Sequence, residues 1–346
     1  MSLKKQKRDE IKAFILFNIR NHPSDIVHIT QQKYGLTRPS VLRYIHDMGK
    51  KDQIDIQGST KNRKYSLKPI RSIGRVHQIE KSLAEDKVWR DEVLPLLKNT
   101  KSNLINICQY GFTEIFNNAI EHSEGTKITL KVIVWIDRIK IEISDDGVGI
   151  FNKIQKKYNL DDSMHAILEL SKGKLTTEPE SHTGEGIFFT SRMFDVFMIV
   201  SGKLGFGHMR NLDVLTDTGK NIKGTTVSME ISLFSERTTK SVFEKFASVD
   251  LGFDKTIVPV KLARYGNENL ISRSQARRLL AHLDKFKNVI LDFNDVPHIG
   301  RAFADEIFRV FAIAHPNTKI TPMNHRISIK NLIQEIESGK TEETIK

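Results

Sequence analysis

The residues of this sequence best suited to chemistry are a carboxylate and an amide one helical turn apart. Glu114 and Asn118 lie four residues apart, and two glycine-containing segments follow them, at residues 145–149 and 183–186. Glycine lets the backbone approach a ligand closely and adopt dihedral angles that are closed to other residues. Polar side chains followed by two such segments suggest a nucleotide site.

A helix is predicted to carry Glu114 and Asn118. At about 100° per residue, Asn118 and His122 fall inside the apolar stripe of this helix, and Glu114 lies at its edge. Burying an uncompensated amide or carboxylate is costly, so we expect a pocket that a polar ligand occupies. The stripe recurs at helical spacing without an internal proline and consists of Leu104, Ile107, Cys108, Gly111, Ile115 and Ala119.

A β-hairpin is predicted next, over residues 127–144. Apolar and polar residues alternate on both sides of Asp137 and Arg138, which lie near the turn. Asp145 therefore lies at the end of the second strand, directly before the glycines of its segment.

In this order the segments resemble the superfamily of gyrase-type ATPases, histidine kinases, mismatch-repair ATPases and related chaperones, which includes the anti-sigma-factor serine kinases. The resemblance covers about residues 100–235 and implies a two-layer α/β ATP-binding sandwich. Its motifs are Glu114-x-x-x-Asn118-Ala119-x-x-His122, Asp145-x-Gly147-x-Gly149, Gly184-x-Gly186 and the closing strand Gly224-Thr225-Thr226-Val227.

The resemblance implies that ATP and Mg²⁺ are the cofactors. Asn118 would hold Mg²⁺, and Asp145 would accept a hydrogen bond from the adenine amino group, which Thr225 or Thr226 would flank. Glu114 stands where ATP-hydrolysing and serine-kinase members carry a general base, which activates water or a protein hydroxyl. His122 is interpreted either as part of this site or as a core histidine.

The glycines have implied roles as well. Gly147 and Gly149 would let the backbone pass the nucleotide. Gly184 and Gly186 would present amides to phosphate at the start of a helix, where an anion is favoured.

Residues 151–182 would form the ATP lid, with a helix over residues 163–171. The segment is rich in lysine, and we interpret most of these side chains as solvated. They are Lys153, Lys156, Lys157, Lys172 and Lys174.

Length and composition agree with a soluble protein of two or three domains. The chain has 346 residues, of which 39% are hydrophobic. The N-terminus lacks the uninterrupted apolar segment of a signal peptide, and no membrane span is visible. Cys108 is the single cysteine, which excludes an intrachain disulfide. We therefore expect a cytoplasmic protein with no membrane contact.

The positive charge is concentrated near the N-terminus. The formal net charge is +12, and residues 1–70 contribute +9 of it, with 15 lysines and arginines against 6 aspartates and glutamates. A local concentration of this kind favours nucleic acid as a partner.

The N-terminal region is predicted to contain three helices and a β-hairpin. Helices are predicted over residues 5–21, 24–34 and 38–48, with Pro39 in the first turn of the third, and a β-hairpin follows over residues 54–67.

This order resembles a winged helix-turn-helix over about residues 5–68. The resemblance implies that the third helix enters the DNA major groove and that the hairpin tip, the wing, contacts phosphate. A domain of the same fold that contacts protein stays an alternative. The residues expected nearest double-stranded DNA are Arg38, Ser40, Arg43 and Tyr44 on the helix and Lys61, Arg63 and Lys64 on the wing.

Residues 71–99 are predicted to form a helical connector that packs on the following domain. His77 is interpreted as a connector residue and not as a phosphoacceptor. The histidine-kinase motif has an acidic residue directly after the histidine and a later proline, and this sequence lacks both.

The C-terminal part alternates strand and helix signals and resembles the sulfate-transporter and anti-sigma-antagonist (STAS) fold over about residues 255–338. That family has Asp-Ser-Ser at the start of a helix where this chain has Gly300, Arg301 and Ala302. The serine that a partner kinase would phosphorylate is absent. We expect this domain to bind a regulatory protein or to support a homodimer.

The sequence thus predicts a multidomain α+β and α/β protein. Residues 1–70 form a winged helix, 71–99 a connector, 100–240 an ATP-binding α/β sandwich and 250–340 a small STAS-like α/β domain. The preferred function is an ATP-dependent, DNA-binding regulatory protein with slow ATP hydrolysis. A protein serine kinase and an ATP-binding scaffold without turnover remain alternatives.

Overall fold

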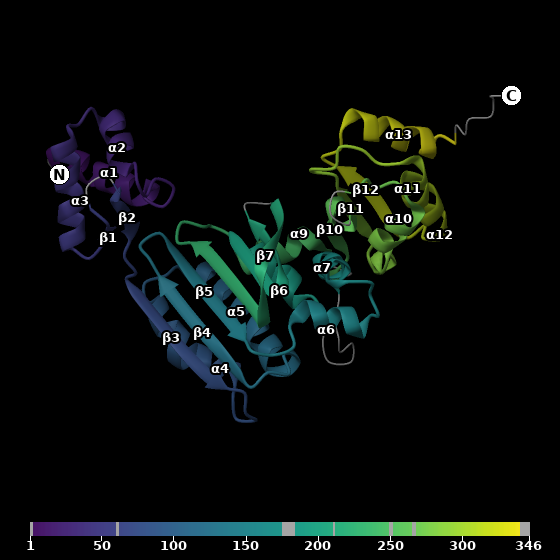
Figure 1. Ribbon diagram of the computed structural model, residues 1–346, viewed down its shortest axis with the longest axis horizontal. Coiled ribbons are helices and arrows are strands. Elements are labelled where there is room, and N and C mark those ends of the chain that lie inside the picture. The colour runs from purple at the N-terminus through teal and green to yellow at the C-terminus, as the bar shows by residue number, and fades with distance from the viewer. Residues whose placement is uncertain are drawn as a thin grey trace.

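The computed structural model describes residues 3–59, 62–174, 184–209, 212–248, 252–264 and 268–339. Figure 1 shows three lobes in chain order: a small helical lobe, a central lobe built on a large sheet, and a C-terminal lobe with a small sheet of its own. The mixed α/β architecture predicted from the sequence is confirmed.

The N-terminal lobe consists of three helices and an antiparallel hairpin around one apolar core. Gly35 ends the second helix in a left-handed conformation (φ 63°), and Pro39 lies in the first turn of the third. Ile15, Val41 and Ile45 are among the fully buried core residues. The elements are α1 (Leu3–Asn18), α2 (Ile26–Tyr34), α3 (Arg38–Lys50), β1 (Ile54–Gln57) and β2 (Lys64–Leu67).

The central lobe is a five-stranded antiparallel sheet covered on one face by helices. Side chains of the inner strands alternate between buried and partly exposed, so one face of the sheet is apolar. Helices α5 (Ser102–His122) and α8 (Gly186–Met193) pack on that face, and Figure 1 shows α5 lying across the strands. The strands, in spatial order, are β3 (Arg71–Gln78), β4 (Lys127–Val134), β5 (Arg138–Asp145), β7 (Leu212–Ser232) and β6 (Val196–Met209).

Strand β3 corrects the prediction of a helical connector over residues 71–99. It pairs antiparallel with β4 from Arg71 opposite Val134 to Gln78 opposite Lys127. Helical structure begins only at α4 (Glu85–Val88) and continues to Leu97. As an edge strand, β3 has few buried side chains, so its residues lack the clear alternation of β4 and β5.

The segment predicted as a lid contains two helices, α6 (Ile150–Lys157) and α7 (Ser163–Lys172). The second agrees with the helix predicted over residues 163–171. Its start is capped by Asp162, whose Oδ1 accepts a 2.8 Å hydrogen bond from the His165 N–H. Residues 175–183 lie outside the described part of the chain.

The C-terminal lobe has a three-stranded parallel sheet with helices packed around it. A capping box between Ser272 and Gln275 begins the first long helix of this lobe. The strands are β10 (Lys255–Pro259), β11 (Asn288–Asp292) and β12 (Lys319–Met323). The helical elements of this lobe include η4 (Val260–Ala263), α10 (Arg273–Leu280), α11 (Arg301–Asp305) and α13 (Ile327–Glu337), and α9 (Thr239–Phe246) precedes the lobe.

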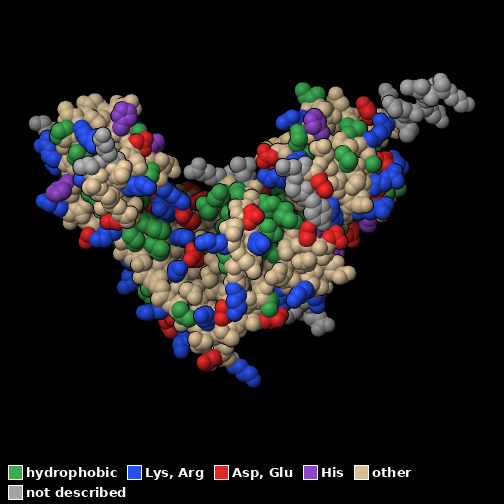
Figure 2. All heavy atoms as spheres, in the orientation of Figure 1, with side chains coloured by type: hydrophobic (Ala, Val, Ile, Leu, Met, Phe, Trp, Pro, Cys, Tyr) green, Lys and Arg blue, Asp and Glu red, His purple; other side chains and the backbone are tan. Residues whose placement is uncertain are grey.

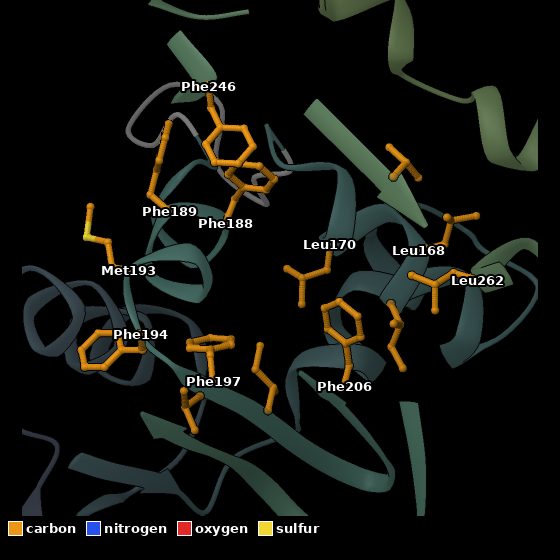
Figure 3. Packing of buried hydrophobic residues seen from close by; sticks show 14 of the residues in the cluster. Leu168, Leu170, Phe188, Phe189, Met193, Phe194, Phe197, Phe206, Phe246 and Leu262 are labelled. Atoms are coloured by element: carbon orange, nitrogen blue, oxygen red, sulfur yellow. The ribbon is translucent and has the colours of Figure 1, made fainter. Parts of the chain in front are cut away.

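Helix α7 connects the central lobe to the C-terminal lobe. Every residue from Ala166 to Lys172 is buried, and the helix packs against α6 and α8 on one side and against β10 and η4 on the other. Figure 3 shows Leu168 directed toward Leu262 of η4 and Leu170 toward Phe206 of the central sheet. The lid helix is therefore part of the core that joins the two lobes.

A buried polar network fixes this contact. Lys172 Nζ lies 2.5 Å from Glu169 Oε1 and donates to the carbonyls of Arg278 (3.1 Å) and Ala281 (2.9 Å). These carbonyls lie in the last turn of α10 and at its C-cap residue, where carbonyls have no partner within the helix. Glu169 Oε2 lies 2.9 Å from His282 Nδ1. Lys172 is only 1% exposed, so it is not among the solvated lysines of this segment.

We expect Lys172→Met to lower the free energy of unfolding by about 3–5 kcal/mol, because the change leaves the Glu169 carboxylate buried without its ammonium partner. The double variant Glu169→Gln/Lys172→Met should lose less than Lys172→Met alone. Chemical denaturation measures both, with Lys157→Met on the exposed face of α6 as the control. An unchanged Lys172→Met variant would contradict the structural role of this ion pair.

Candidate functional site

A cavity of about 340 Å³ lies between the helical layer and the sheet of the central lobe. Its walls come from α5, the end of β5, α6, α7, the start of α8 and β7. Its volume falls in the range of small-molecule sites. The segments that the sequence singled out are far apart along the chain, and their residues meet around this cavity.

One face of α5 supplies a polar row to the cavity. Tyr110, Glu114, Asn118 and His122 recur every four residues and all line it. The opposite face of α5 packs into the core, where Phe112 is among the fully buried residues. The predicted conflict between polar residues and an apolar stripe is thus resolved by a cavity on that side of the helix.

Glu114 reaches across the cavity to the start of α8. A Cβ atom placed on Gly186 would lie 1.9 Å from Glu114 Oε2, so a side chain at this position would force the carboxylate to move. Burial raises the pKa of Tyr110, and the charges of Glu114 and Glu185 and a hydrogen bond to Glu114 raise it further. The Tyr110 phenol therefore keeps its proton and can hold the Glu114 carboxylate in place.

Asp145 joins three elements at the other end of the cavity. Its Oδ1 accepts hydrogen bonds from Gly147 N (2.9 Å) and Thr225 N (3.2 Å). Thr225 Oγ1 in turn accepts a 3.0 Å bond from Ile150 N at the start of α6. Burial raises the pKa of Asp145 above its usual value, although the two backbone donors act in the opposite direction.

Of the two glycines implied to let the backbone pass the nucleotide, one lines the cavity and the other does not. Gly149 lines the cavity and has a positive φ of 85°, a conformation that side chains rarely adopt. Gly147 is not among the lining residues. A Cβ there would lie 1.9 Å from the Ser123 carbonyl oxygen, so this glycine serves the packing of the loop against the end of α5.

The other sequence-predicted residues also divide into those that line the cavity and those that do not. Gly184, Gly186 and Thr225 line the cavity together with Glu114, Asn118 and Asp145, whereas Thr226 is absent from the lining and donates a 2.9 Å hydrogen bond to Ser144 Oγ. Thr183 lies outside the described residues.

Lys153 is a lining residue whose position the sequence did not reveal. It belongs to the lysine-rich segment whose lysines are mostly interpreted as solvated, yet it borders the cavity, and its Nζ donates a 2.8 Å hydrogen bond to the His122 carbonyl oxygen. Its spacing of four residues after Gly149 could have indicated this, because α6 turns that position back toward the glycine. Lys156 and Lys157 are exposed, as expected.

The residues expected to contact DNA form part of the N-terminal lobe surface, where Figure 2 shows lysine and arginine side chains. Arg38 and Arg43 on α3 and Lys64 on β2 are exposed. Ser40, Tyr44 and Arg63 are partly buried, and Ser40 Oγ is hydrogen-bonded to Thr37 Oγ1 (2.9 Å). Lys61 lies outside the described residues.

The helix start predicted to lack a phosphoacceptor is α11, which begins at Arg301 after Gly300. Arg301 Nη1 lies 3.7 Å from Glu335 Oε2 on α13. The guanidinium therefore pairs with a carboxylate of its own lobe, which compensates for its position near a positive helix end.

A family model described as a STAS-like domain of unknown function matches residues 275–337. The STAS-like prediction for the C-terminal lobe is thereby confirmed over this range. A comparison with curated proteins finds no match. Among the residues that the structure describes, no helix is long and apolar enough to span a membrane.

We expect Gly147→Ala to reduce the free energy of unfolding by about 1–3 kcal/mol or more, because the new methyl group would overlap the Ser123 carbonyl. Gly74→Ala in β3 is the matched control, since a Cβ at Gly74 meets no atom within 4 Å. Thermal and chemical unfolding of the two variants measure the difference. Equal stability of the two would show that the loop moves at little cost.

Proposed function

We propose that this protein binds ATP with Mg²⁺ in the central cavity and uses the nucleotide to control how its flanking lobes contact DNA or a protein partner, with slow ATP hydrolysis. The observation that carries the proposal is the convergence of Glu114, Asn118, Asp145, Gly186 and Thr225 on one cavity. If the separate motifs belong to one nucleotide site, their residues must lie close together in the fold. Chance matches to short motifs would be scattered over the fold.

The geometry at Asp145 suits recognition of an adenine amino group. Both backbone donors bond to Oδ1, so the carboxylate is held in one orientation at the cavity wall. Thr225 stands beside it on β7 and is nearly buried. A base placed here would be read by an oriented acceptor in a site sheltered from water.

The opposite end of the cavity suits a triphosphate and its metal ion. Helix α8 begins at Gly186, and the N–H groups of its first turn and the helix dipole favour an anion. The Asn118 amide oxygen on α5 lines the cavity, and an oxygen ligand of this kind suits Mg²⁺. Mg²⁺ would neutralise phosphate charge and orient the terminal phosphate.

Glu114 is the proposed general base. Its carboxylate lies against Gly186, at the helix start that would bind phosphate. It would therefore lie near the nucleophile that attacks the terminal phosphate. Water is the proposed nucleophile. A protein serine kinase would use the same carboxylate on a partner's hydroxyl, and the products of the reaction distinguish the two.

Control of the flanking lobes is supported by helix α7. Leu170 lines the cavity, and two residues later Lys172 is buried against the end of α10 in the C-terminal lobe. A nucleotide that changes the position of α7 would therefore act directly on the STAS-like lobe. This is the physical link that a nucleotide-dependent regulator needs.

For the N-terminal lobe we propose a winged helix that binds double-stranded DNA. Three helices followed by an antiparallel hairpin, exposed arginines on α3 and the concentration of positive charge in this part of the chain support it. Arg20 of this lobe forms a salt bridge with Glu230 of β7, so the lobe also contacts the sheet that carries the cavity.

We expect Asp145→Asn and Glu114→Gln to separate binding from chemistry. Asp145→Asn should weaken ATP binding about tenfold or more, because the oriented acceptor for the adenine amino group is lost. Glu114→Gln should retain ATP and lower turnover about 10²–10⁴-fold. Calorimetry measures binding, and labelled ATP shows whether free phosphate or phosphorylated protein appears.

The control for both is Asp161→Asn, a change at an exposed residue outside the cavity lining. Unchanged turnover in Glu114→Gln would remove its assignment as the base, and phosphate transferred to a protein hydroxyl would favour the kinase reaction.

For DNA we expect Arg43→Ala to weaken binding to a preferred sequence most and Lys64→Ala to weaken all duplexes. Loss of one phosphate contact should reduce the slope of log K against log salt by about one unit. Titrations at several salt concentrations test this, with Lys240→Ala, a change at an exposed lysine of α9, as the control. A full-length protein that ignores duplex DNA with and without ATP would identify the N-terminal lobe as a protein-contact domain.

A further inference from the structure

We propose that Lys153 is the cation that recognises the phosphate chain of the nucleotide, an inference that rests on the proposed ATP site. Around the cavity, Lys153 is the only lysine or arginine among the described lining residues. Three carboxylates, those of Glu114, Asp145 and Glu185, line the same space. These carboxylates repel a polyphosphate, and Lys153 is the side chain of the lining that opposes their charge in addition to Mg²⁺.

The backbone fixes Lys153 beside the cavity. Its N–H donates to the Gly149 carbonyl oxygen (3.0 Å), so it lies one turn after the glycine at which α6 begins. Phe151 and Ile154 on the same helix are buried at 1% and 4% exposure. These two side chains prevent α6 from rotating, and the lysine therefore remains at the cavity wall.

A phosphate oxygen could displace a present contact of the Lys153 ammonium group or bind beside it. Nζ donates to the His122 carbonyl oxygen at 2.8 Å and lies 3.1 Å from Glu124 Oε1. Glu124 is 61% exposed, so this ion pair lies at the rim, where water weakens it. An ammonium has three N–H donors, which leaves capacity for a phosphate oxygen in addition to the carbonyl.

The chemistry of the side chain favours phosphate over base or ribose. A lysine is a compact charge on a flexible stem, and it binds phosphate oxygens without a fixed geometry. Adenine has no anionic group for it to neutralise. Lys153 should therefore contribute more to affinity as the number of phosphates on the ligand increases.

The experiment compares adenosine, AMP, ADP and ATP, with Mg²⁺ present, on the full-length protein. Lys153→Gln should weaken ATP binding about 10- to 100-fold, weaken ADP less and leave adenosine unchanged. Lys153→Arg keeps the charge and should retain most of the ATP affinity. Lys157→Gln, an exposed lysine of the same helix, should behave as the unmodified protein.

Two results would overturn the inference while leaving the ATP site intact. One is an unchanged ATP affinity in Lys153→Gln. The other is an equal loss for adenosine and ATP, which would mean that Lys153 only anchors the end of α5 through the His122 carbonyl. Thermal unfolding is measured in parallel, and Lys153→Arg keeps the test decisive if the glutamine variant unfolds. If the unmodified protein binds none of the four ligands, the ATP site itself is wrong.

Discussion

The packing of α5 against the central sheet is the constraint on which the site depends. Gly111 lies in the middle of this helix, and a Cβ there would be 2.5 Å from the Phe194 ring and 3.1 Å from Met229 Sδ. The close approach seats the apolar stripe of α5 on the sheet. Because the helix repeats every 3.6 residues, the row from Tyr110 to His122 must then face the gap toward α6 and α8. The cavity and its polar wall follow from one helix–sheet contact.

Backbone contacts then bring the other segments to that wall. Gly186 allows α8 to start against Glu114, and Gly224 places β7 against Asp145, where a Cβ would lie 2.1 Å from its carbonyl oxygen. Hydrogen bonds from Thr225 N to Asp145 and from Ile150 N to Thr225 join β5, β7 and the start of α6 at the same end of the cavity. The glycines are thus needed for contacts within the protein as much as for access of a ligand.

The sequence was most informative where local pattern and tertiary environment agree. The helix that carries Glu114 and the alternation of β4 and β5 could be predicted because a regular stripe is buried along the whole element. β3 could not be predicted, because its side chains show no clear alternation of buried and exposed positions. It forms a strand through its backbone pairing with β4. The burial of Lys172 was equally invisible, since the carbonyls it satisfies belong to α10, more than 100 residues away. Gly147 carries the motif spacing of a ligand contact, and only the structure reveals that Ser123 occupies the space beside it.

Helix α7 would determine how the proposed nucleotide binding acts on the C-terminal lobe. Detaching the helix from that lobe would expose the Glu169–Lys172 pair and break the bonds of Lys172 to two carbonyls and of Thr256 Oγ1 to the Lys172 carbonyl. Uncovering these groups and the apolar residues between them costs several kcal/mol. A nucleotide bound with micromolar affinity provides about 8 kcal/mol in total, and only the difference in affinity between two arrangements can shift their populations. Moving α7 together with the STAS-like lobe breaks none of these contacts, so we expect the helix and that lobe to respond to nucleotide as one unit.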